Sequence, residues 1–121
     1  MPNISNNKPY DLEERTFLFA KNVRLFVKTL DKTIANIEDM KQVVRSSGSV
    51  AANYIEANED FSKKDFIFRA KISRKEAKES VLWLRLINET NELLNKKNAK
   101  TLIEEAIELK KILSAIIDKS K

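Results

Sequence analysis

The chain has one glycine and two prolines in 121 residues. Tight turns between β-strands depend on these two residue types, so their scarcity favours an all-α fold. The glycine lies inside the stretch 45–56, RSSGSVAANYIE, which has helical patterns on both sides. Glycine in a helix interior costs about 1 kcal/mol relative to alanine. We therefore expect a compensating close contact with another helix at Ser46, Ser47 and Gly48.

The length and composition are those of one helical domain, expected over 11–119 after a flexible, polar lead-in at 1–10. The chain has no cysteine, which excludes disulfides and thiol nucleophiles. No apolar run approaches membrane-spanning length, so a cytoplasmic protein with no membrane partner is the default expectation. The formal net charge of +5 is compatible with an anionic partner.

Apolar residues recur at alternating steps of four and three residues along most of the chain, which predicts amphipathic helices. Asp11 and Ser62 are expected to cap the first and third helices. Short connections favour an antiparallel up-down-up-down four-helix bundle, in which the second and third helices meet at 45–56. The third helix has more apolar face than one neighbour requires. The four helices are expected at about 11–30, 37–58, 62–90 and 99–119.

Four sequence blocks, in this order, resemble the four helix bundle protein family, which includes proteins encoded in intervening sequences of bacterial 23S rRNA genes. Related bundles are accessory proteins of diversity-generating retroelements, where a pentamer with a basic surface works with nucleic acid and a reverse transcriptase. The blocks are 11–20 (DLEERTFLFA), 42–57 (QVVRSSGSVAANYIEA), 62–66 (SKKDF) and 75–85 (KEAKESVLWLR).

The resemblance implies a homo-oligomer, and specifically a pentamer, without established catalytic activity. We accordingly expect a non-enzymatic accessory or scaffold protein with no cofactor, no catalytic residue and no small-molecule substrate. RNA or DNA, and an enzyme that acts on nucleic acid, are the candidate partners besides the protein itself.

Positive charges recur at seven-residue steps along the third predicted helix and so share one face. Such a stripe can follow a phosphate backbone and bind it without regard to base sequence. The alternative is an ordinary solvated helix face. The candidate nucleic-acid-binding residues are Lys64, Lys71, Lys78 and Arg85 of the stripe, together with Lys75.

Carboxylates form two E-x-x-E pairs, Glu56 with Glu59 and Glu76 with Glu79. Two such pairs on facing helices can hold Mg²⁺, as in all-α nucleotide pyrophosphohydrolases, which these pairs resemble. We favour a structural polar network with no metal, because E-x-x-E is common in charged helices. The chain also has no histidine for the E-x-x-H pattern of di-iron bundles. The expected network comprises Arg45, Ser49, Asn53, Glu56, Glu76 and Glu79.

Overall fold

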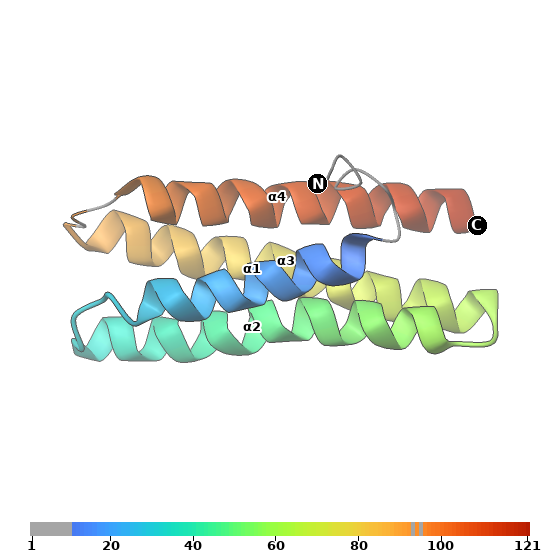
Figure 1. Ribbon diagram of the computed structural model, residues 1–121, viewed down its shortest axis with the longest axis horizontal. Helices are drawn as coiled ribbons and strands as arrows, with labels where there is room; N and C mark the ends of the chain where they lie inside the picture. The colour runs from blue at the N-terminus through green and yellow to red at the C-terminus, as the bar shows by residue number, and fades with distance from the viewer. Residues whose placement is uncertain (1–10, 93, 95) are drawn as a thin grey trace.

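The computed structural model describes residues 11–92, 94 and 96–121, and within these residues it has four α-helices and no strand. The helices lie side by side along a common direction (Figure 1). The expected lead-in at 1–10 lies outside the described residues. The prediction of an all-α fold is confirmed, and the helices pack as they do in a bundle. Their bounds are α1 Leu12–Val27, α2 Ile34–Glu59, α3 Lys63–Thr90 and α4 Lys96–Ser120.

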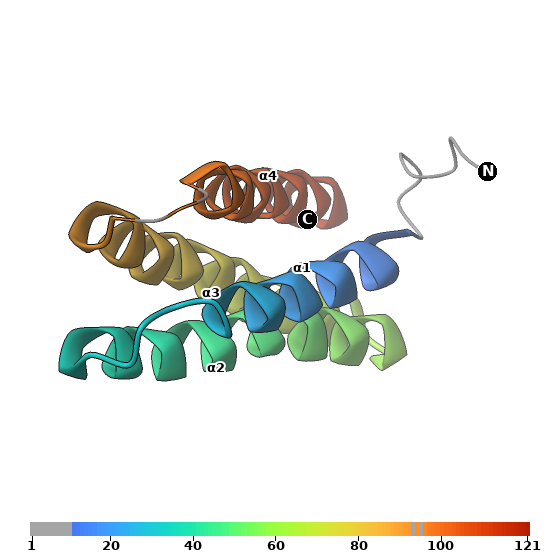
Figure 2. The same cartoon turned by 60° about the vertical axis from the view of Figure 1, so that its left-hand side comes forward.

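Each helix packs against two others. The contact between α2 and α3 is the most extensive and that between α1 and α4 the least, which agrees with the separation of α4 from α1 in Figure 2. The buried apolar side chains of all four helices form one core, because each helix has one apolar stripe that only its neighbours can cover. Core residues include Phe19, Val23, Val43, Val50, Leu84, Ile87, Leu109 and Leu113.

Side-chain caps fix the starts of two helices. The Ser62 hydroxyl accepts a hydrogen bond from the Asp65 amide at 3.0 Å, as predicted for α3. The Thr33 hydroxyl accepts one from the Asn36 amide at 3.1 Å and starts α2 three residues before the expected position. The predicted Asp11 cap of α1 is wrong, because its backbone is helical rather than extended and its side chain makes no capping hydrogen bond.

The first helix is shorter than the periodicity predicts. It ends at Val27, and residues 28–33 form a loop before α2 begins. At this end of the molecule α2 therefore extends beyond α1 (Figures 1 and 2). Within the part of the chain that the structure describes, no helix covers the first turns of α2 on that side.

Buried serines lie at the contact between α2 and α3. The hydroxyls of Ser46 and Ser80 are hydrogen-bonded to each other at 2.8 Å. Further along the same contact, the Ser73 hydroxyl of α3 donates to the Val50 carbonyl oxygen of α2 at 2.7 Å. All three serines are fully buried, and their small side chains let the two helix backbones approach closely. These two pairs fix the register of α3 against α2. Val50 comes after Ser46 on α2, whereas its partner Ser73 comes before Ser80 on α3.

The glycine does not lie at this serine contact. A Cβ atom built on Gly48 would lie 3.1 Å from the Nη2 atom of Arg24 on α1, and its nearest neighbours all belong to that guanidinium group. The expectation that Gly48 faces the third helix is therefore wrong. Successive helical residues are rotated by about 100°, so Gly48 points away from the side on which Ser46 meets α3. The missing side chain leaves room for Arg24, which donates to the carbonyl oxygens of Ala20 and Val44.

Ser46→Leu should lower the free energy of unfolding by about 1 to 3 kcal/mol or more, because the larger side chain overpacks the contact between α2 and α3 and removes the hydrogen bond to Ser80. Gly48→Ala is the matched control on the same helix. It meets only the end of a flexible arginine, so the gain in helix propensity should keep its stability at or above that of the wild type. Urea denaturation measures both. Equal losses of stability in the two variants would contradict the placement of the close helix contact at Ser46.

Candidate functional site

Five cations surround a shallow hollow of about 420 Å³ between α3 and α4. Among the residues that the structure describes, none of those lining this hollow is acidic. We call this surface the basic depression. It is lined by Lys71, Arg74, Lys75 and Lys78 of α3 and by Lys110 and Ser114 of α4.

Helical spacing explains why these side chains meet. Positions 71, 74, 75 and 78 follow steps of three and four and so share one face of α3. The core residues Ala70, Ala77 and Leu84 lie on the adjoining, buried side of the helix. Lys110 follows the core residue Leu109 on α4 and reaches the same hollow from the neighbouring helix.

The depression is partly organised by a hydrogen bond between the helices. The Arg74 guanidinium donates to the Ser114 hydroxyl at 3.2 Å, which positions that cation at the junction. The three lysines of α3 are exposed, and no ion pair to them occurs among the described residues. Ammonium and guanidinium groups in this state can donate charge-assisted hydrogen bonds to phosphate oxygens.

The structure brings only part of the predicted basic stripe into this site. Lys71, Lys75 and Lys78 line the depression, whereas Lys64 and Arg85 lie outside it on the same helix. Arg85 instead donates to Glu89, one turn along α3, at 3.3 Å. Of the residues predicted to bind nucleic acid, three therefore share the depression, and the stretch of cations without an acidic neighbour is shorter than the seven-residue repeat indicates.

Sequence reasoning missed the contribution of α4 to the depression. Lys110 and Ser114 are four residues apart and lie beside the α4 core positions Leu109 and Leu113, which was a usable signal. Assigning them to this site also requires the register between α3 and α4. No pattern within either helix supplies that register.

A separate ionic cluster joins α2 to α3. The Arg45 guanidinium donates to Oε1 of Glu79 at 3.2 Å, and its Nη2 atom lies 3.3 Å from Oε1 of Glu76. The Glu76 carboxylate is buried, whereas Arg45 is half exposed. Hydrogen bonding to Glu76, followed by the charge of that carboxylate, raises the pKa of Arg45 above its usual value. The cluster therefore pairs a buried anion with a permanent cation.

The other members of the predicted polar network do not join this cluster. Asn53 donates to the carbonyl and hydroxyl oxygens of Ser49, at 3.0 and 2.9 Å, so this pair is local to α2. Glu56 is exposed to solvent. The reason is the register: Val50 already lies opposite Ser73, so residues after Val50 move progressively away from Glu76.

The four carboxylates of the two E-x-x-E pairs are not gathered into one site. Within the described residues, no group of three or more acidic, histidine or cysteine side chains has the arrangement needed to hold a metal ion. Glu76 and Glu79 face Arg45, whereas Glu56 and Glu59 are exposed near the far end of α2. This geometry gives no support to the alternative of a metal-dependent pyrophosphohydrolase.

Arg45→Met should lower the free energy of unfolding by about 1 to 3 kcal/mol, because it leaves the Glu76 carboxylate buried without its cation. Lys21→Met, on the exposed face of α1, is the control and should change stability by less than about 0.5 kcal/mol. Urea denaturation measures the stability of both variants. An equal change in the two variants would contradict this role for Arg45.

No described helix combines the length and hydropathy required to span a membrane. A search of curated proteins finds no match to the sequence. Among solved structures, the fold is similar to that of a protein of unknown function from Bacteroides thetaiotaomicron, which belongs to the S23 ribosomal protein family. The two share 27% sequence identity with a TM-score of 0.76, over 88% of this chain and 97% of the other.

The family comparison covers nearly the same part of the chain. The model of the 23S rRNA-intervening sequence protein family matches residues 9–115, a range that includes all of α1, α2 and α3 and most of α4. It thus includes the serine contact, the ionic cluster and the basic depression. The chain belongs to the 23S rRNA-intervening sequence protein family.

Proposed function

We propose that the protein is a non-enzymatic, homo-oligomeric accessory or scaffold protein that binds nucleic acid through the basic depression. The observation that carries the proposal is the convergence of five cations from two helices on one hollow, with no acidic residue in its lining among the described residues. Surface lysines are ordinarily interspersed with acids. A concentrated positive surface instead favours a polyanionic partner.

The proposed architecture is an antiparallel up-down-up-down bundle. Contacts in opposite sequence order support this topology for three helix pairs. Ser46 and Val50 of α2 meet Ser80 and Ser73 of α3 in turn. Between α1 and α2, Glu13 contacts Asn58 and Arg24 contacts Val44. Between α1 and α4, Arg15 contacts Glu105, and Phe26 and Leu102 line the same hollow.

Self-association is supported by large apolar side chains that the bundle leaves exposed. Phe68, Leu82 and Leu86 are exposed on one face of α3. Clusters of this kind on a small domain are characteristic of surfaces that other proteins cover. The proposed number of five subunits follows from the resemblance to pentameric bundles, and we take it as part of the proposal.

A ring would repeat the basic depression once in every subunit. Individual phosphate contacts are weak at physiological salt, but contacts made by linked sites on one polyanion add through their high effective concentration. Such binding needs no base recognition. It suits an accessory protein that holds RNA or DNA for an enzyme acting on it, and the name of the family associates its members with genes of a structural RNA.

Binding of single-stranded RNA should weaken steeply with salt, and Lys71→Glu/Lys78→Glu should reduce the affinity at least tenfold at about 50 mM salt. Each phosphate contact that is lost should also lower the slope of log K against log salt by roughly 0.7. Fluorescence anisotropy with a labelled oligonucleotide measures both quantities.

Lys21→Glu/Lys97→Glu makes the same change in charge on α1 and at the start of α4, outside the depression. It should retain most of the affinity, because a local site responds to position as well as to net charge. Absence of binding by the wild type at low salt, or equal losses in the two double variants, would contradict the proposed nucleic-acid site.

Native mass spectrometry of the wild type should give an assembly of five chains, about five times the 14.0 kDa of one chain. The apolar surfaces described above provide the driving force, so the assembly should persist at high salt. A single 14.0 kDa species at micromolar concentration would contradict the homo-oligomer while leaving the basic depression to be tested by itself.

A further inference from the structure

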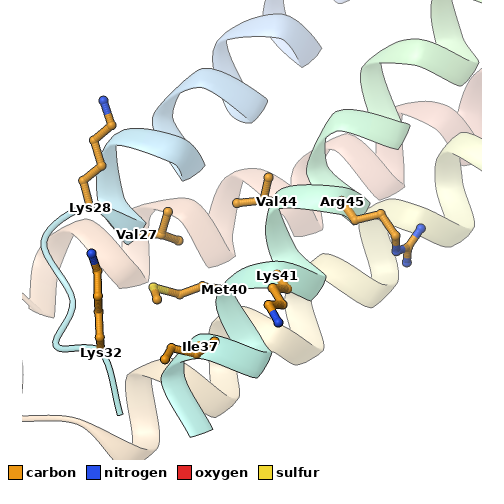
Figure 3. Close-up of a pocket in the computed structure, with 8 residues that line it drawn as sticks. All are labelled: Val27, Lys28, Lys32, Ile37, Met40, Lys41, Val44 and Arg45. Carbon is orange, nitrogen blue, oxygen red and sulfur yellow. The ribbon is translucent and has the colours of Figure 1, made fainter. Parts of the chain in front are cut away.

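An open groove of about 690 Å³ lies where α2 extends beyond the end of α1. Its floor is apolar and consists of Val27 from α1 with Ile37, Met40 and Val44 from α2 (Figure 3). The groove exists because α1 stops at Val27, so none of the four described helices covers this side of the first turns of α2. The apolar strip continues to Ile34, which is 87% exposed.

Cations form the rim of this groove. Lys28 and Lys32 lie on the loop side, and Lys41 and Arg45 lie on the side of α2 (Figure 3). Arg45 is already engaged by Glu76 and Glu79, and the Lys41 ammonium lies 3.8 Å from a carboxylate oxygen of Glu38. Lys28 and Lys32 are therefore the rim cations left to face an occupant. The groove therefore suits a partner that combines exposed apolar side chains with negative charge.

The last turns of α3 have this combination of properties. Leu82 and Leu86 are 50% and 38% exposed, and they lie one turn apart on the same outward face. Glu89 follows on that face, where it pairs with Arg85, and Glu92 is exposed just after the helix ends. The carboxyl end of a helix adds partial negative charge of its own. We call this surface the α3 end face.

The groove and the α3 end face lie at the same level along the bundle. Asn36 and Asn91 exchange side-chain hydrogen bonds of 2.8 and 2.9 Å, which ties the first turn of α2 to the end of α3. Residues 37–44 of α2 and 82–89 of α3 therefore lie at the same level along the long axis of the bundle. Two copies standing with their helices parallel would present the groove of one at the height of the α3 end face of the other.

We propose that the groove of one chain receives the α3 end face of a second copy. This interface rests on the homo-oligomer proposed above and deepens it by assigning the two surfaces that meet. Because the two surfaces differ, a subunit that binds one neighbour through its groove still has its α3 end face free to bind another. Such a heterologous contact closes into a ring when the rotation between neighbours permits. The basic depression extends along α3 from Lys71 to Lys78, which is one turn before Leu82. It would therefore remain open when the α3 end face is covered.

The test uses two double variants of the full chain. Lys32→Glu/Lys41→Glu reverses charge on the rim of the groove, and Leu82→Gln/Leu86→Gln removes the apolar part of the α3 end face. All four side chains are exposed to solvent, so the fold should persist, and circular dichroism melts verify it. Each variant alone should give the mass of a single chain. An equimolar mixture should give a species of two chains, because one intact groove and one intact α3 end face remain.

Two matched controls should keep the mass of the wild type. Lys21→Glu/Lys97→Glu makes the same charge change elsewhere, and Phe17→Gln/Leu25→Gln removes exposed apolar side chains from α1. Should the α3 variant lose its helical signal, Glu89→Lys/Glu92→Lys replaces it in the mixing experiment.

A wild-type oligomer that survives either double variant, or a mixture in which both variants stay single chains, would overturn this interface. The first outcome leaves the proposed homo-oligomer intact and assigns the groove to a different partner. A wild type that is itself a single chain overturns both proposals, so the two failures are distinguishable.

Discussion

The hydrogen-bonded serine contact between α2 and α3 determines where every other feature of the molecule lies. Ser46 meets Ser80 and Ser73 meets Val50, with no large side chain between the helices at these points. Burying hydroxyl groups is favourable only when each finds a partner, so few alternative alignments of the two helices are compatible with these pairs. The contact combines close approach with a defined register, which a seam of leucines alone would specify less strictly.

The register in turn separates the charges of the molecule. It places Arg45 against Glu76 and Glu79, so two of the acids of α3 are neutralised on the side facing α2. The lysines on a neighbouring face of α3 lie beside α4, which contributes another lysine. The same alignment sets the end of α3 level with the uncovered start of α2. The nucleic-acid surface and the subunit interface that we propose therefore depend on one helix contact.

The periodicity of apolar residues was sufficient to predict four helices, because each helix needs one stripe to bury and the chain has almost no turn residues. The periodicity failed to predict contacts that depend on how two helices pack against each other. Gly48 was assigned to the wrong partner, since no sequence pattern reveals that the Arg24 side chain fills the space above it. Glu56 was placed in the polar network and Lys110 was left out of the basic site for a related reason. Spacing within a helix identifies a shared face, but only the packing of two helices determines which faces meet.

The central claim is that assembly multiplies a weak phosphate site, and the neutral variant Leu82→Gln/Leu86→Gln tests it most directly. This variant leaves the charge of the chain and the basic depression unchanged, so any difference in RNA binding comes from assembly. At equal chain concentration and low salt, its affinity for a long oligonucleotide should fall by roughly tenfold or more relative to the wild type, with a shallower dependence on salt. An unchanged affinity and salt slope in a variant that mass spectrometry shows to be a single chain would contradict the account.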